Sequence, residues 1–298
     1  MLKDNVVIKG IGGFYYVLHE GEIIECKGKG AIKNQGILLK VGDRVELSFE
    51  DEHTPTISKV LDRKNEFIRP PIANVDGLII FMALDAPKPN FDLVDKLLIM
   101  AESNDLETLI IINKCELDNQ EDLSFIKEAY EPYYKVIYTQ KLFDEEENEG
   151  AIDEIKSFIK DKKVALAGSS GVGKSTLINR LKEDVSVETG NISEKNNRGR
   201  HTTRHVEIFT IDNGGMVYDT PGFSSFDIEA VGDILAKDLI KYYIDLEPYA
   251  KLCKFKDCSH IKEKDCMLRD AVRTGKVSKK RYLSYKSNYL NMIENEKY

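Results

Sequence analysis

The 298-residue sequence predicts a multidomain α/β protein, in which an N-terminal OB-like β-barrel and a C-terminal helical segment flank a doubly wound parallel sheet. Three observations support this prediction. Residues 1–62 alternate apolar and polar side chains in short runs between glycines. Residues 75–218 alternate between apolar strands and amphipathic helices. From about residue 226 the apolar residues take helical spacing, interrupted by cysteines. The expected domains are residues 1–62, 63–225 and 226–298.

The N-terminal domain is expected to be a small barrel because its turn signals recur every 8–12 residues, as they do in all-β domains. About sixty residues suit an OB-like barrel. The predicted strands cover residues 13–18, 22–26, 36–42 and 44–49. Arg69-Pro70-Pro71 then interrupts regular structure, and we interpret it as a linker to the next domain.

The central domain is expected to be doubly wound because its strands are near-continuous apolar runs, typical of a sheet covered on both faces. These strands are predicted at residues 75–84, 108–113, 135–138, 163–167, 206–211 and 215–218. The helices between them are predicted at residues 91–103, 151–161 and 174–182.

Charge is distributed unevenly along the chain. The net charge is −8, but residues 1–70 are balanced, residues 71–230 carry −13 and residues 231–298 carry +5. No apolar signal stretch and no eighteen-residue apolar window occurs, so we expect a cytoplasmic protein with no membrane contact. Five cysteines, three of them close together, suit a metal site in a reducing compartment better than disulfides.

A phosphate-binding loop is predicted where Gly168-x4-Gly173-Lys174-Ser175 follows an apolar strand and precedes a helix. Glycines let successive backbone N–H groups face an anion at the helix N-terminus. Lys174 is expected at the β- and γ-phosphates, and the Ser175 hydroxyl at Mg²⁺. The residues expected to surround the phosphates are Gly168, Ser169, Ser170, Gly171, Val172, Gly173, Lys174, Ser175 and Thr176.

Two further segments are expected to respond to the γ-phosphate. Asp219-Thr-Pro-Gly222 ends a strand, where Asp219 can hold the Mg²⁺ shell and the Gly222 amide can meet the γ-phosphate, although such a sequence is also typical of a simple turn. The loop before it offers Thr202 and Thr203 as Mg²⁺ ligands, with a solvated basic loop as the alternative.

A guanine-recognition motif is predicted at Asn113-Lys114-Cys115-Glu116, after a buried strand. An acidic side chain in the last position can accept hydrogen bonds from N1–H and the N2 amine of guanine, which adenine lacks. Glu116 stands where aspartate is usual, and its extra methylene extends the carboxylate by about 1.5 Å. The motif precedes the phosphate loop by 55 residues, whereas the phosphate loop comes first in most GTP-hydrolysing switches. We therefore expect a GTPase domain in rotated order, with the C-terminal segment attached directly after Gly222.

A structural zinc site is predicted from Cys253-x4-Cys258-x-His260-x5-Cys266. Three thiolates and one imidazole complete a closed tetrahedral set, so catalysis by this metal is not expected. Cys26 and Cys115 lie far from this group in the sequence and are interpreted as free thiols.

Together these motifs and their order resemble the RsgA (YjeQ) family of circularly permuted GTPases, over nearly the whole chain. The segments Val41-Gly-Asp-Arg-Val45, Arg69-Pro-Pro-Ile-Ala-Asn-Val-Asp76 and Gly199-Arg-His-Thr-Thr203 also match that family's signatures. The resemblance implies an assembly factor that binds the small ribosomal subunit through ribosomal RNA. GTP hydrolysis would be stimulated by the subunit and coupled to release. Thr139-Gln140-Lys141 departs from the Ser-Ala-Lys sequence expected beside the guanine.

The resemblance also implies an unusual catalytic residue. Phe223 occupies the place of the glutamine that orients water in Ras-like enzymes. The family's substitute is a histidine that corresponds to His201, which could orient water or could merely contact RNA or solvent. The residues expected to take part in catalysis are His201, Lys174 and Asp219.

RNA contacts are expected at both ends of the chain. Phe14, Tyr15 and Tyr16 lie near lysines and could stack on bases, or could fill the barrel core. The basic residues between Arg273 and Arg281 could follow RNA phosphates, or could form a solvated helix.

The expected partners are the small subunit, its RNA and GTP or GDP, with the chain acting as a monomer. Three alternatives stay open: a regulatory GTPase that binds a protein partner, an ATP-using kinase, and an RNA-binding module with an inactive nucleotide site.

Overall fold

The computed structural model describes residues 5–28, 36–49, 54–116, 119–140, 145–182, 206–220 and 234–296. The chain forms two compact units, each built from three segments of sequence. The first comprises Met1–Ile79, Leu142–Ala167 and Gly173–Ser224. The second comprises Ile80–Lys141, Gly168–Val172 and Ser225–Tyr298.

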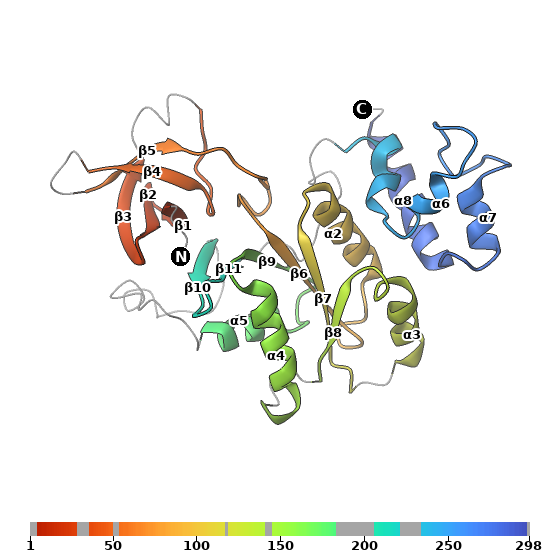
Figure 1. Cartoon of the computed structure of the whole chain (residues 1–298), viewed down its shortest axis with the longest axis horizontal. Coiled ribbons are helices and arrows are strands. Elements are labelled where there is room, and N and C mark those ends of the chain that lie inside the picture. The colour runs from red at the N-terminus through yellow and green to blue at the C-terminus, as the bar shows by residue number, and fades with distance from the viewer. Residues whose placement is uncertain are drawn as a thin grey trace. The chain divides into compact units, whose positions relative to one another are not determined.

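A five-stranded barrel forms the N-terminal part of the first unit (Figure 1). β1 pairs with β2 and β4, β2 with β3, β3 with β5, and β5 with β4, so the ring of strands closes. Each strand contributes one buried side chain to the centre: Val7, Val17, Cys26, Val45 and Ile57. The predicted barrel is therefore confirmed. Its strands are β1 (Asn5–Ile11), β2 (Phe14–His19), β3 (Glu22–Gly28), β4 (Arg44–Ser48) and β5 (Thr56–Val60).

The strand predicted at residues 36–42 is wrong. Gly36 and Gly42 have φ values of +70° and +94°, which an extended strand does not accommodate, and Val41 makes only an isolated bridge to Ile72. β1 and β5 lie where no strand was predicted. Val6, Val7 and Ile8 in β1 are all buried, so this strand lacks the alternation on which the prediction depended.

Beyond the barrel, the first unit contains β9, β10 and β11, the last of which ends at Asp219. β1 pairs with β10 antiparallel, with Lys9 opposite Glu207 and their side chains 2.6 Å apart. β10 is antiparallel to β11, and β11 is parallel to β9. The remaining elements of this unit are α4 (Glu145–Ile159), β9 (Lys163–Gly168), α5 (Lys174–Lys182), β10 (Glu207–Thr210) and β11 (Met216–Asp219).

The segment interpreted as a linker is a packed turn. The Phe67 amide donates to the Ile72 carbonyl at 2.8 Å, and Ile72 and Ala73 are fully buried. The Tyr218 hydroxyl on β11 donates to the Ala73 carbonyl at 2.6 Å. This turn therefore connects the barrel to β11 through a buried hydrogen bond. It is not an exposed linker between two domains.

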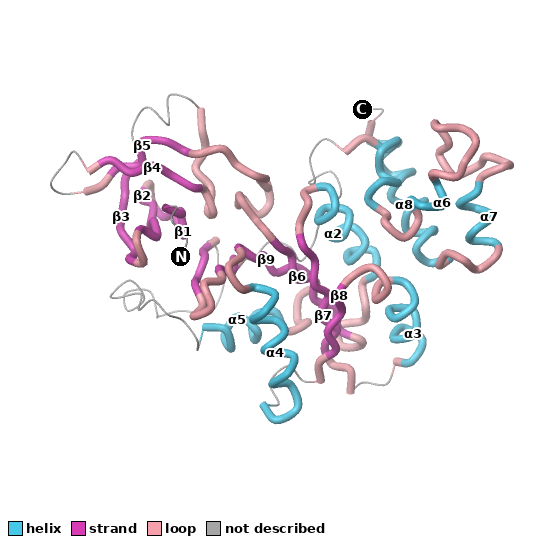
Figure 2. Tube along the Cα trace, viewed as in Figure 1, coloured by secondary structure: helices cyan, strands magenta, loops and turns pink. Residues whose placement is uncertain are grey.

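Among the described residues, the second unit contains strands in the order β6-β7-β8 and six helical segments, one of which is the 3-10 helix η2. Figure 2 distinguishes the helices from the strands by colour. β7 and β8 are parallel, and α2 packs against both β7 and η2. α2 begins after Asn90, whose side chain accepts from the Leu93 amide at 3.1 Å. None of the described helices has the length and apolar character needed to cross a membrane. The elements are β6 (Gly77–Ala83), α2 (Phe91–Ser103), β7 (Glu107–Asn113), α3 (Gln120–Ala129), β8 (Lys135–Tyr138), η2 (Ala236–Tyr242), α6 (Glu247–Ala250), α7 (Met267–Arg273) and α8 (Lys279–Asn295).

The packing around Gly42 predicts a substitution effect. A Cβ added to Gly42 would lie 2.1 Å from the Ala73 carbonyl oxygen, whereas one added to Gly21, at a similar φ of +89°, meets nothing within 4 Å. We expect Gly21→Ala to cost about 1 kcal/mol of strain and Gly42→Ala to cost roughly 2 kcal/mol more, because backbone must shift. Denaturant unfolding followed by circular dichroism measures both. Equal losses of stability in the two variants would contradict tight packing between Gly42 and Ala73.

Candidate nucleotide and metal sites

The predicted phosphate loop joins the end of β9 to the first turn of α5. Gly168 has φ +130°, and a Cβ there would lie 2.2 Å from the Phe81 carbonyl oxygen, so only glycine fits. Gly173 has φ +116°, and its carbonyl accepts from the Leu177 amide at 3.0 Å, which starts the helix. Burial lowers the pKa of Lys174, so an anion beside it would stabilise its charged form. This arrangement suits phosphate binding at a helix N-terminus.

Asn113 connects the predicted base motif to the phosphate loop. It ends β7 and is 3% exposed. Its Nδ2 donates to the Val172 carbonyl at 2.9 Å, and its Oδ1 accepts from the Thr139 hydroxyl at 3.0 Å. The same side chain therefore holds the loop after β7 against the phosphate loop and against the residue after β8.

Thr139 is a site residue whose role sequence reasoning missed. It was identified only as a departure from the expected Ser-Ala-Lys sequence. In the structure its carbonyl accepts from the Cys115 amide at 3.1 Å, in addition to its hydroxyl bond to Asn113. The signal that could have found it is its place directly after the last strand before α4.

Lys114 and Glu116 are presented differently. Lys114 has φ +62°, and its Nζ donates to the Ala86 carbonyl in the loop between β6 and α2. Glu116 is an exposed residue. The structure thus fixes the lysine by a backbone contact and presents the acidic residue on the surface.

Asp219 lies at the end of β11, where its Oδ2 is 3.0 Å from the Lys182 Nζ. Lys182 ends α5 and also lies 3.9 Å from Glu207. The motifs did not point to Lys182, because its pairing depends on how α5 packs. The other predicted residues of the switch segments, His201, Thr202, Thr203 and Gly222, lie outside the described residues.

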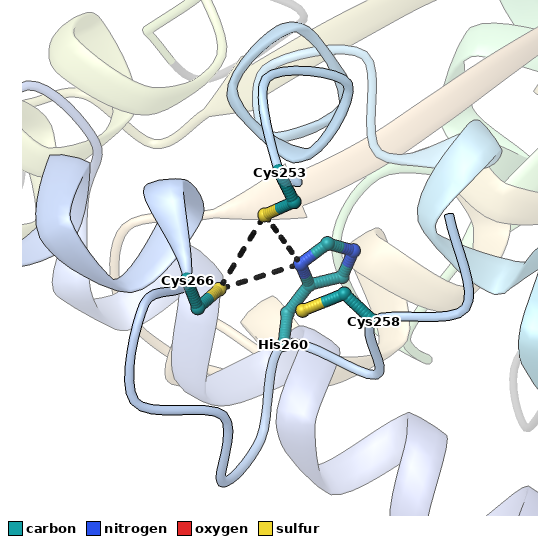
Figure 3. Close-up of side chains that lie close together, drawn as sticks. All are labelled: Cys253, Cys258, His260 and Cys266. Atoms are coloured by element: carbon teal, nitrogen blue, oxygen red, sulfur yellow. Dashed lines mark hydrogen bonds between the residues drawn. The ribbon is translucent and has the colours of Figure 1, made fainter. Parts of the chain in front are cut away.

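The four predicted metal ligands converge in the C-terminal segment (Figure 3). Their ligand atoms all lie within 4.8 Å of one another. The His260 Nδ1 is 3.6 Å from the Cys253 sulfur and 3.4 Å from the Cys266 sulfur, and these two sulfurs are 3.9 Å apart. Cys258 completes the set, and all five cysteines of the chain are free thiols. This cluster could hold a metal ion through three sulfurs and one ring nitrogen.

Glu263 organises the loop between the ligands. Its carboxylate accepts from the amides of Ser259, Ile261 and Lys262 at 2.9–3.0 Å, and from the Ser259 hydroxyl at 2.6 Å. Burial raises the pKa of a carboxyl, but the donors around Glu263 outweigh it and lower its pKa to about 2. The loop is therefore fixed by a charged acceptor that the cysteine and histidine pattern does not reveal.

Helix α8 supports the same loop from outside. Tyr282 and Tyr285 donate their hydroxyls to the carbonyls of His260 and Ser259, each at 2.9 Å. The loop that contains Ser259 and His260 therefore packs together with α8.

The predicted RNA-contacting residues divide into exposed and buried sets. Phe14 is 36% exposed and has the Lys27 ammonium 5.5 Å from its ring centroid, whereas Tyr15 packs against the barrel core. In the basic tail Lys276 and Lys279 are exposed, but Arg281 is 1% exposed and forms ion pairs with Asp95 and Asp245. The interpretation of Arg281 as an exposed RNA contact is wrong, because carboxylates from distant segments enclose it.

Comparison with known proteins gives matches over the whole chain. The model of the RsgA GTPase family matches residues 60–229, and that of the RsgA N-terminal domain matches residues 6–57. A small ribosomal subunit biogenesis GTPase RsgA from Caldanaerobacter subterraneus is 39% identical over 98% of this chain and 96% of its own length. The protein of the same name from Agathobacter rectalis is 41% identical over 98% and 99%.

Solved structures agree with these matches. YloQ, described as a circularly permuted GTPase, superposes with a TM-score of 0.78 at 32% identity, covering 98% of this chain and 95% of its own. YjeQ from Thermotoga maritima gives a TM-score of 0.77 at 30% identity, with 98% of both chains covered. The fold, the rotated order of the motifs and the full-length matches together place this chain in the RsgA family of GTPases.

Proposed function

We propose that this chain is a GTPase that acts in the biogenesis of the small ribosomal subunit and is stimulated by that subunit. The observation that carries this proposal is the hydrogen bond between Asn113 and Val172, which joins the base motif to the phosphate loop in a chain whose full-length relatives bear that name. Hydrolysis of GTP would be coupled to release from the subunit.

The residues assigned to GTP follow from the two loops. Glu116 would accept hydrogen bonds from the guanine, while Lys174 and the loop amides would bind the phosphates. Ser175, Asp219 and the threonines Thr202 and Thr203 would hold Mg²⁺, which supplies charge neutralisation at the phosphates when it is bound. His201 would orient the attacking water when the protein is bound to the subunit.

The cysteine and histidine cluster fits one structural zinc ion. In a tetrahedral site with zinc–sulfur and zinc–nitrogen distances of about 2.3 and 2.1 Å, ligand atoms lie about 3.5–3.8 Å apart. The separations of 3.6, 3.9 and 3.4 Å among Cys253, His260 and Cys266 agree with that size. Four protein ligands leave no position for substrate, so the metal would stabilise the C-terminal segment.

The contacts with ribosomal RNA would come from the barrel, proposed as residues 1–62, and from the C-terminal segment, proposed as residues 226–298. Support comes from the exposed Phe14 ring with Lys27 above it, and from the exposed Lys276 and Lys279. The protein would act as a monomer in the cytoplasm.

Glu116 predicts an unusual nucleotide selectivity. Glu116→Asp should increase the preference for GTP over ATP, roughly tenfold or about 1.4 kcal/mol, because the shorter side chain returns the carboxylate to the usual position. Equilibrium binding of fluorescent GTP and ATP analogues measures the ratio. Glu107→Asp makes the same exchange at the exposed start of β7 and should leave the ratio unchanged. If the wild-type protein binds GTP less than ten times more tightly than ATP, the chain is not GTP-specific.

Glu263 predicts a loss of metal affinity without loss of a ligand. Glu263→Gln removes the charged acceptor of three loop amides and should weaken zinc binding roughly tenfold, as outer-shell substitutions do. Competition with a chromogenic chelator gives the affinity. Glu247→Gln, which removes the same kind of charge from the pair that Glu247 makes with Lys251, is the control. If Glu263→Gln binds zinc as tightly as the wild type, the four ligand residues alone fix the conformation of the loop.

The proposed activity is tested by GTP turnover with and without purified small subunits. Subunits should accelerate hydrolysis, and His201→Ala should reduce the stimulated rate by about a hundredfold, while His205→Ala serves as the matched control. Co-sedimentation should also be stronger with a non-hydrolysable GTP analogue than with GDP. Equal turnover with and without subunits, or sedimentation indifferent to the nucleotide, would contradict the proposal.

A further inference from the structure

Arg281 is a fully buried arginine at the start of α8. Its Nε and Nη2 donate to the two carboxylate oxygens of Asp245 at 2.9 and 2.7 Å, which is a bidentate arrangement. Its Nη1 donates to Asp95, on α2. Since an unpaired charge at 1% exposure would be strongly unfavourable, these two carboxylates fix where the first turn of α8 can lie.

Aromatic side chains complete the enclosure of the guanidinium. Its Cζ lies 5.3 Å from the ring centroid of Tyr130 and 4.8 Å from that of Tyr243. The Tyr130 hydroxyl donates to Asp95 at 2.7 Å, so the residue that follows α3 is bonded to α2 through the same carboxylate. The cluster therefore joins α2, the end of α3 and α8.

The neighbouring Lys280 adds a second contact to α3. Its Nζ lies 3.3 Å from the Glu121 carboxylate and 4.8 Å from the Phe125 ring centroid. The first turn of α8 thus contacts α3 at its beginning, middle and end. In the sequence α2 directly precedes β7 and α3 follows it, and the base motif lies at the end of β7.

The other end of this connection is the loop before α2. The Leu84 amide donates to the Asn113 carbonyl at 3.2 Å, and Lys114 donates to Ala86. Pro87 Cδ is 3.8 Å from the position that a Cβ on Gly171 would take, so this loop also borders the phosphate loop. A displacement of α2 would therefore move groups that contact both nucleotide motifs.

We propose that Arg281 is a positioning residue for nucleotide binding, which holds α2 and α3 so that the loops at residues 84–90 and 113–116 keep their binding geometry. Because coupling between two sites is reciprocal, a bound guanine nucleotide stabilises α8 in return. This inference rests on the proposed role of Asn113–Glu116 in base recognition.

Hydrogen exchange of the full-length protein, with and without GDP, tests the inference directly. GDP should slow amide exchange in the phosphate loop, in residues 113–116 and in α8. If GDP protects the two nucleotide motifs but leaves α8 unchanged, the coupling is disproved while the proposed function stands. If GDP protects neither motif, the assignment of the nucleotide site is wrong and the coupling falls with it.

Two variants separate positioning from general stability. Arg281→Met should weaken GDP binding about tenfold, or about 1.4 kcal/mol, and should abolish the GDP-dependent protection of α8. Arg281→Lys keeps the charge but loses the bidentate contact, and should recover part of both effects. Arg273→Met makes the same change at an exposed residue that pairs with Asp270, and should bind GDP as wild type does. Wild-type GDP affinity in folded Arg281→Met would overturn the proposal, and if that variant does not fold, the exchange pattern of the wild type decides it.

Discussion

The arrangement of the second unit depends on the buried side chain of Asn113. This amide lies 59 residues before Val172 in the sequence, yet it donates to that residue's carbonyl, while its own oxygen accepts from Thr139. A polar group at 3% exposure must have such partners, because leaving them unsatisfied costs about 1–3 kcal/mol. Three loops that follow three strands are therefore fixed to one another by one residue. Chain rotation leaves this arrangement intact, since the loops meet at the ends of strands whatever their order in the sequence.

The sequence predicts most strands of the α/β part and the helices α2 and α5 closely, because local signals there agree with tertiary packing. It did not predict α3, and α4 begins at Glu145 instead of residue 151. α2 and α5 have the predicted bounds, 91–103 and 174–182, since an amphipathic pattern and a capping asparagine mark the first, and a glycine loop marks the start of the second. The barrel was predicted as a class but not strand by strand. β1 is buried over three consecutive residues, and residues 36–42 contain glycines in the left-handed region. A search for period-two alternation therefore misses β1 and wrongly predicts a strand at residues 36–42.

In the candidate sites, too, the sequence reveals the residues that form a local pattern but not those whose role depends on tertiary contacts. Spacing alone identified Cys253, Cys258, His260 and Cys266, because metal ligands on one short loop are close in sequence as well as in space. Glu263 accepts from loop amides, and Thr139 bonds to the Asn113 side chain and the Cys115 amide, and such bonds leave no pattern of residue types. Arg281 was misinterpreted because its partners Asp95 and Asp245 lie 186 and 36 residues away. In a run of basic residues, only the tertiary contacts distinguish a buried arginine from its exposed neighbours.

The rotated order of the motifs attaches the C-terminal segment directly after Gly222. That attachment lies outside the described residues, within which α8 contacts α2 and α3, the helices before and after the base motif in the sequence. The barrel contacts different elements, because β1 pairs with β10 and the turn at Ala73 accepts from Tyr218, next to Asp219. A change at Asp219 would therefore strain hydrogen bonds to the barrel, whereas occupancy of the base motif would act on the helices that hold α8. Among the described residues, the contacts near Asp219 therefore lead to the barrel, whereas those near the base motif lead to the C-terminal segment.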